Sequence, residues 1–332
     1  MTSLRRSDVV VAAVISGTLL IASTLQARRI SKAPSIVFAS VDAGRRVLTT
    51  KDDFITRLGP FDRAARMKSG RPVSEAQYLQ FVASNVVAWA PNDRATVQKA
   101  WNALVPGLQR WTLPLPDRVL FVETTGLEEG GAEYTRANAI MLPKSFFTGT
   151  QPEPREYIVA HELFHVLSRA SPALRDKVYA AIGFQPCGEQ PYLPDLAERR
   201  LTNPDAPRND HCIQLHVQQT AIWATPILFS SSARYDVAKG EPFFNYMQMK
   251  MLVVERSADG RAHYDPSRPR LVDLNDVTGF FEQVGQNTKY IMHPEEILAD
   301  NFAYLVLGKR NLPSPDVQRR LDAVLSGRPP GL

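Results

Sequence analysis

Two stretches in the first third of the chain carry apolar residues at helical spacing. In residues 74–90, SEAQYLQFVASNVVAWA, apolar side chains recur every three or four positions behind Ser74, which suits a helix N-cap. In residues 93–111, DRATVQKAWNALVPGLQRW, the spacing returns and Pro106 interrupts it. With the short helical and turn signals around them, these stretches predict a mainly helical N-terminal region over residues 31–115.

The pattern changes after residue 115. Short apolar runs that favour β-structure predict strands at 118–124 and 132–143, the second ending at a proline. Residues 154–169 and 294–308 have helical spacing, each with a proline at its start. Residues 211–230 are typical of strands, whereas 243–256 fit a strand or a helix. We therefore expect an α+β fold that is mainly helical with a small sheet.

Residues 185–210 form a long segment rich in proline and aspartate, without either periodicity. A loop of this length inside a compact domain is usually functional, pinned in place, or both. Cys187 and Cys212 are the only two cysteines of the chain, and in an oxidising compartment they predict one disulfide that would pin the loop. Two free buried thiols are the alternative.

The N-terminus has the pattern of a targeting segment. Arg5 and Arg6 precede VVVAAVISGTLLIASTL, an uncharged apolar run over residues 9–25. A signal peptide ending near residue 27 is the first interpretation, and an uncleaved N-terminal anchor is the alternative. Under both interpretations, most of the chain is expected to be exported, either to the periplasm or as a secreted protein.

Composition and charge narrow the class of protein. The chain has 332 residues, of which 44% are hydrophobic and 22% charged, which is typical of globular proteins. The formal net charge is +5, and five basic residues fall within the first 32. The remainder is close to neutral and shows no Lys/Arg stripe, so we expect no nucleic-acid partner. Contact with a membrane is expected only through the possible anchor, and the oligomeric state is left open.

The segment HELFH carries the strongest chemical signal. On a helix, His161 and His165 lie one turn apart on the same face and can bind one Zn²⁺. Glu162 then points toward a water on the metal and can act as a general base. The metzincin extension would need glycine and histidine further along the helix, but Ser168 and Ser171 stand there instead. The third ligand must come from elsewhere.

HPEEILADNF supplies a candidate for that ligand. Glu296 and Asp300 are one helical turn apart, so Glu296 can complete the metal site while Asp300 accepts the free N–H of a ligand histidine, with His161 as the expected partner. Glu295 is the alternative ligand, but Ala299 stands at its matching position. Glu296 is therefore preferred.

The combination of HELFH with EILAD at 296–300 resembles the gluzincin metallopeptidases, the thermolysin-like branch of the zincins. The resemblance covers roughly residues 116–308. It implies a zincin-like catalytic domain over 116–330, a mixed sheet whose edge strand precedes the HExxH helix, one Zn²⁺ per chain, and a peptide or protein substrate paired with that edge strand within 132–142. The whole chain also resembles exported bacterial proteins that combine HExxH with TNPDAP and HPEEILADNF, which identifies no substrate.

Hydrolysis of a peptide bond also calls for a donor that stabilises the developing oxyanion. Tyr290 and His293 are the nearest candidates in sequence to Glu296, and His211 and His216 are their rivals. The expected function is an exported zinc metallopeptidase. A zinc-binding envelope protein without proteolytic activity and a zinc hydrolase acting on a non-peptide amide are the alternatives.

Overall fold

The computed structural model describes residues 33–149 and 151–328, so the predicted signal peptide or anchor at 1–27 lies outside the described residues. Within those ranges no helix combines the length and apolarity needed to cross a membrane. Helices and two main sheets together confirm an α+β fold. The α-helices of the described residues are α1 (Val41–Thr49), α2 (Pro60–Arg66), α3 (Glu75–Ser84), α4 (Pro91–Leu108), α5 (Arg155–Ala170), α6 (Pro172–Ala180), α7 (Pro194–Ala197), α8 (Phe280–Val284), α9 (Pro294–Val306) and α10 (Pro315–Leu325).

The first sheet is mixed and has the strand order β1-β2-β4-β3. Strands β1, β2 and β4 run parallel, and β3 is an antiparallel edge strand. Strand β1 pairs with β2, so residues from both sides of the boundary predicted at 115/116 belong to this one sheet. The strands are β1 (Ser35–Phe38), β2 (Arg118–Thr124), β3 (Tyr134–Arg136) and β4 (Ala139–Pro143).

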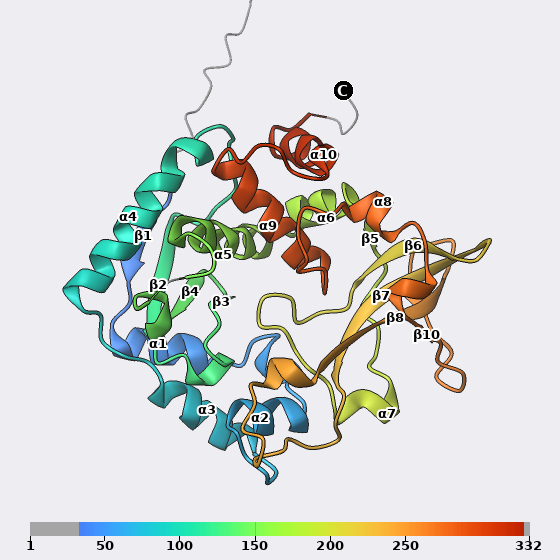
Figure 1. Ribbon diagram of the computed structural model, residues 1–332, viewed down its shortest axis with the longest axis horizontal. Helices are drawn as coiled ribbons and strands as arrows, with labels where there is room; N and C mark the ends of the chain where they lie inside the picture. Colours follow the sequence, from blue (N-terminus) through green and yellow to red (C-terminus); the bar gives the residue numbers. More distant parts are fainter. Residues whose placement is uncertain (1–32, 150, 329–332) are drawn as a thin grey trace, which may run out of the picture. The chain divides into compact units, whose positions relative to one another are not determined.

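Both faces of this sheet are covered by helices (Figure 1). In β2, Phe121 packs into the core shared with α4 and α5, whereas its neighbour Val122 packs into the core shared with α1 and α3. In β4, Ile140 packs into the first of these cores and Met141 into the second. Since successive strand residues point to opposite faces, both strands read as continuous apolar runs.

The sequence prediction of one strand over 132–143 is wrong. The chain turns at Ala137, which has a φ of 52°, and the segment forms an antiparallel hairpin of β3 and β4. The strand directly before α5 is therefore the inner strand β4, and the edge strand β3 comes one strand earlier. On the side of β3 that faces away from β4, the Thr135 N–H donates to Asp205.

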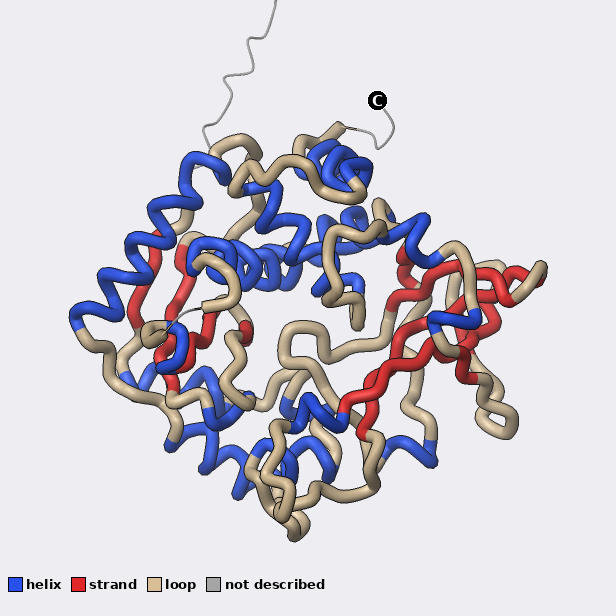
Figure 2. Tube along the Cα trace, viewed as in Figure 1, coloured by secondary structure: helices blue, strands red, loops and turns tan. Residues whose placement is uncertain are grey.

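The second sheet is curled and antiparallel, with the strand order β10-β8-β7-β6-β5. The Cys187–Cys212 disulfide is present and joins the segment after β5 to β6, which confirms that prediction. The 185–210 region contains the short helix α7 and then a loop that crosses toward the first sheet (Figure 2). The strands are β5 (Phe184–Pro186), β6 (His211–Val217), β7 (Thr220–Ser230), β8 (Met247–Arg256), β9 (Ala262–His263) and β10 (Leu271–Val272).

Helices α5 and α9 pack against each other in the centre of the larger core. Ala160 of α5 and Ala299 of α9 are completely buried, and such small side chains allow two helix backbones to approach closely. Phe164 and Phe302 pack with ring centroids 5.6 Å apart. Through this contact, the polar side chains of HELFH on α5 face those of Glu296 and Asp300 on α9.

Candidate metal centre

Helix α5 presents the two histidines of HELFH to α9. His161 and His165 lie one turn apart, and their ring centroids are 4.9 Å from each other. His165 is fully buried, and the side chain of His161 is 13% exposed. The rings therefore stand at the boundary between the core and an open cleft.

Glu296 approaches both rings from the first turn of α9. The helix begins at Pro294. His293 is its N-cap residue, and the His293 Nδ1 atom accepts a hydrogen bond from the backbone N–H of Glu295. Carboxylates are favoured in this first turn because the helix dipole is positive there. Glu296 Oε2 lies 3.2 Å from His161 Nε2 and 3.6 Å from His165 Nε2.

Each histidine is held from its other side by a second carboxylate. His161 Nδ1 lies 2.7 Å from Asp300 Oδ1, as the sequence predicted. His165 Nδ1 lies 2.9 Å from Glu295 Oε1, a contact that the sequence did not reveal. Both carboxylates accept an N–H from Nδ1, and the Nε2 atoms of both rings face Glu296.

The electrostatics of the two rings differ. Burial lowers the pKa of His161, but the hydrogen bonds to Asp300 and Glu296 outweigh it and hold that pKa well above its usual range. Burial lowers the pKa of His165 to about 3, so this ring is neutral at physiological pH. In the metal-free protein, His161 therefore carries the proton that a metal would replace.

The arrangement fits a zinc ion. His165 Nε2 is buried and has no hydrogen-bond partner among the described residues, which is costly unless a further group binds there. Zinc bonds of ~2.0–2.1 Å in tetrahedral geometry place neighbouring ligand atoms about 3.3 Å apart. The distances of 3.2 and 3.6 Å from Glu296 to the two rings bracket that value. His161, His165 and Glu296 thus form a set that could hold a metal ion.

Glu162 lies beside this set and is almost fully buried. Thr135 of the edge strand β3 donates its hydroxyl to Glu162 Oε2 at 2.7 Å, which fixes the carboxylate. Burial raises the pKa of Glu162 to about 7, against the opposing effect of nearby His161. A carboxylate with a pKa near neutrality can both accept and release a proton under physiological conditions.

Residues 202–206, here named the TNPDA segment, bring two further groups to the site. The Asn203 side-chain amide donates to Glu296 Oε1, which leaves Oε2 to face the histidines. Asp205 Oδ1 accepts the backbone N–H of Thr135 at 2.7 Å. Oxygen atoms of Asp205 and Glu162 and a ring nitrogen of His165 all lie within 4.8 Å of one another.

A buried ionic network fixes the start of the TNPDA segment. The backbone N–H of Thr202 donates to Asp62 Oδ1 at 3.0 Å, and Arg66 donates to the Thr202 carbonyl at 2.8 Å. Arg66 also pairs with Asp62 at 2.7 Å and with Glu129 at 2.8 Å. All these groups are buried, so the segment is anchored to α2 through satisfied charges.

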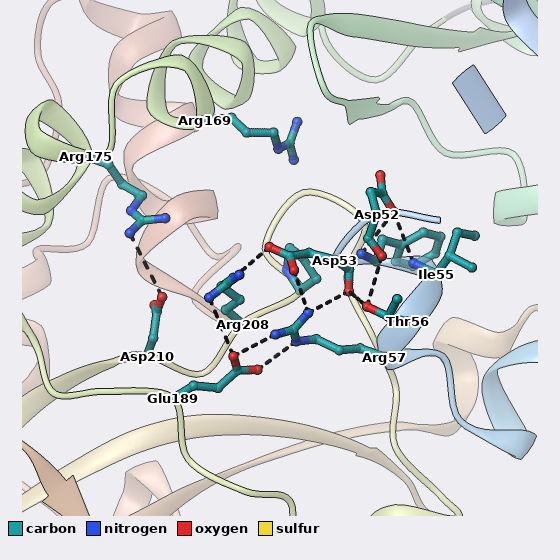
Figure 3. Close-up of polar contacts among 12 residues, drawn as sticks. Asp52, Asp53, Ile55, Thr56, Arg57, Arg169, Arg175, Glu189, Arg208 and Asp210 are labelled. Atoms are coloured by element: carbon teal, nitrogen blue, oxygen red, sulfur yellow. Dashed lines mark hydrogen bonds and ion pairs between the residues drawn. The ribbon is translucent and has the colours of Figure 1, made fainter. Parts of the chain in front are cut away.

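The chain just after the segment is held at Arg208 by a more exposed network (Figure 3). Arg208 donates to Asp53 at 2.7 Å, and Arg57 bridges Asp53 and Glu189. In the middle of the segment, Arg169 at the end of α5 donates to the Asp205 carbonyl at 3.1 Å. The loop is therefore tied to the fold at both ends and in its middle.

The open side of the site is a cleft of about 610 Å³. Its lining contains one basic side chain besides His161, that of Lys289. Tyr290 also lines it, with its ring centroid 6.2 Å from that of His161. The carboxylates of the lining are Glu133, Glu153, Glu162, Asp205, Glu296 and Asp300.

The other histidines considered from sequence lie elsewhere. The structure does not bring His293 to the cleft, because its Nδ1 caps α9 and its Nε2 lies 3.2 Å from the Arg208 carbonyl. His211 lies between Asp210 and Asp176. His216 is exposed on β6. Of the predicted oxyanion candidates, only Tyr290 lines the cleft that contains His161.

Three groups of the site escaped sequence reasoning, Thr135, Asn203 and Asp205, whereas Glu295 was considered only as an alternative metal ligand and not as the partner of His165. Only Asn203 and Asp205 had a signal in the sequence, since TNPDAP lies in a long loop flanked by the disulfide. Comparison of the chain with protein-family models, curated proteins and solved structures gives no significant match. The geometry establishes a buried His-His-Glu set that could hold a metal ion.

Proposed function

We propose that the chain is an exported, zinc-dependent metallopeptidase of the gluzincin type. The observation that carries the proposal is the convergence of His161, His165 and Glu296 on one point, with Glu162 beside it. A site that only bound zinc would have no need of a buried carboxylate with a pKa near 7 at this position. The disulfide is consistent with an oxidising compartment.

The chain's own residues supply proton transfer and orientation. Zinc, when bound by the triad, supplies Lewis acidity that polarises a carbonyl and acidifies water. Glu162 takes a proton from the attacking water and delivers it to the leaving amine. Thr135 holds Glu162 in place through its hydroxyl. Tyr290 is the proposed donor to the developing oxyanion, because it lines the cleft beside His161.

The edge strand β3 is the proposed binding surface for an extended peptide at its start, where Ala132 and Glu133 precede it and line the cleft. It is the outermost strand of the mixed sheet and carries Thr135, which contacts Glu162 directly. A peptide added at such an edge gains main-chain hydrogen bonds, and its side chains enter neighbouring cavities. This arrangement would bring the scissile bond next to Glu162.

Cleavage of a peptide library by the zinc-loaded protein, with and without a chelator, tests the proposal. We expect cleavage that stops on chelation and returns with zinc. Glu162→Gln should keep the metal and lose activity by at least about 100-fold, because one proton-transfer group contributes roughly 10²–10⁴. Glu156→Gln, a similar change in the first turn of α5, is the control that should stay active. Full activity of Glu162→Gln would refute the mechanism.

A further inference from the structure

The edge strand is blocked next to the site by the chain itself. The N–H of Thr135 points away from β4, and a peptide added to β3 would need this donor, but Asp205 Oδ1 already accepts it at 2.7 Å. Ala132 and Glu133, which precede β3, line the open cleft. An extended peptide can therefore run along the start of β3 but cannot continue past Thr135.

The TNPDA segment, which blocks the strand edge, is held firmly in place. Buried Asp62 and Arg66 hold Thr202, and Arg169 holds the carbonyls of Pro204 and Asp205. Moving this segment away from β3 would break its contacts to buried charges, which is strongly unfavourable. The cleft is consequently closed at one end, and a bound peptide must end there.

The charge at the closed end selects which terminus of a peptide fits. Asp205 uses Oδ1 for Thr135, and its second oxygen accepts no hydrogen bond from the described residues. One carboxylate oxygen of Asp205, one of Glu162 and a ring nitrogen of His165 lie within 4.8 Å of one another. With six carboxylates against Lys289 and His161 in the cleft lining, a peptide carboxylate would be repelled and an α-ammonium attracted.

An apolar cavity adjoins the same end of the cleft. It shares Ala132, Glu133, Asp205 and Tyr290 with the cleft. Its lining also contains the buried ion pair of Arg66 and Glu129 and five apolar side chains, those of Leu201, Leu228, Phe243, Phe244 and Met247. A residue whose ammonium lies at Asp205 would direct its side chain into this cavity.

We infer that the site takes the free N-terminus of a peptide and removes an apolar N-terminal residue, with Asp205 binding the α-ammonium. This inference rests on the proposed peptidase function. One water is consumed: its oxygen forms the new C–O bond, the C–N bond breaks, and Glu162 transfers the proton to the leaving amine. The product is a free amino acid and a peptide shortened by one residue.

Matched substrates test the inference on the zinc-loaded full chain. The pair is a leucyl peptide with a free N-terminus and its N-acetylated form, followed by mass spectrometry. We expect stepwise loss of N-terminal residues from the free peptide and at least about 100-fold slower cleavage of the acetylated one, whose N-terminal amide has no positive charge to pair with Asp205. Equal cleavage of both would overturn the inference and leave the peptidase proposal standing. Cleavage of neither would refute both.

A binding measurement on the metal-free protein isolates the role of Asp205. Leucinamide should bind more tightly than N-acetyl-leucinamide by calorimetry, and Asp205→Asn should remove that difference, lowering affinity for leucinamide by roughly 10- to 100-fold. The asparagine keeps an acceptor for the Thr135 N–H, so the fold should be preserved, which thermal melting checks. Glu282→Gln, an exposed acid on α8 outside the cleft, should bind like the wild type. Equal binding of the two amides to the wild type would contradict the assignment.

Discussion

At the level of single residues, the site has an inner set of candidate ligands and an outer set that orients them. Asp300 fixes His161, Glu295 fixes His165, and Asn203 fixes Glu296. Such outer partners select the tautomer of a ligand histidine and raise its basicity. Glu295 therefore acts on His165 as Asp300 acts on His161, although only Asp300 was foreseen.

Substitution of the outer carboxylates tests this division. Asp300→Asn and Glu295→Gln should each weaken zinc binding by roughly 10- to 100-fold, the usual effect of losing such a partner. Competition with a chromophoric chelator measures the affinity. Glu282→Gln, an exposed acid on α8, should match the wild type. Unchanged affinity in Glu295→Gln would show that His165 is oriented by packing alone.

Zinc binding should release protons and strengthen with pH. In the metal-free protein, Asp300 and Glu296 hold the pKa of His161 above its usual range despite burial, so this ring is charged near neutrality. A ligand histidine must be neutral, so binding expels that proton and affinity rises between about pH 6 and 8. His165, with its pKa at about 3, is already neutral and adds nothing. Calorimetry in two buffers of different protonation enthalpy should detect the released proton, and pH-independent affinity would contradict it.

The sequence allowed prediction of the residues whose partners are set by helical spacing. His161, Glu162 and His165 share one helix, and Glu296 and Asp300 share another, so the 3.6-residue repeat fixes each set. The contacts of Thr135 and Asp205 depend instead on how distant elements meet. No local pattern specifies that an aspartate in a loop will bind an amide of a strand 70 residues earlier.

At the level of elements, helices were predicted where α3, α4, α5 and α9 lie, but α6, α8, α10 and the hairpin were not predicted. Ser74 caps α3 as expected, whereas α4 continues to Leu108 through Pro106, which was expected to interrupt it. The β3–β4 turn is centred on Ala137 and Asn138, whereas the turn residues that signal a tight hairpin most clearly are asparagine or aspartate followed by glycine. Without that signal, the two strands read as one.

The disulfide should stabilise the region that carries the TNPDA segment. Cys187 and Cys212 are 25 residues apart, and the chain-entropy model gives about 3.5 kcal/mol for a loop of that size. Replacing both with serine should lower the free energy of unfolding by about this amount in urea denaturation. The wild type under reducing conditions should behave alike, as a control for the serine side chains. A loss below about 1 kcal/mol would show that the buried contacts of the loop suffice.

At the level of the whole molecule, the site joins parts of the chain that are distant in sequence. Helix α5 and strand β3 supply the base and its support, α9 supplies the third ligand, and the TNPDA segment closes one end. The α+β class followed from local patterns. The pairing of β1 with β2 and the curled second sheet did not, because such pairings are set by contacts across long stretches of chain.

The central claim is that one zinc ion binds to His161, His165 and Glu296. The most direct test is the zinc content of the purified chain after incubation with zinc and removal of the excess. The account predicts about one zinc ion per chain for the wild type and for Glu153→Gln, and almost none when the three ligands are all replaced by alanine. A zinc-free wild type, or a triple variant that retains zinc, would contradict it.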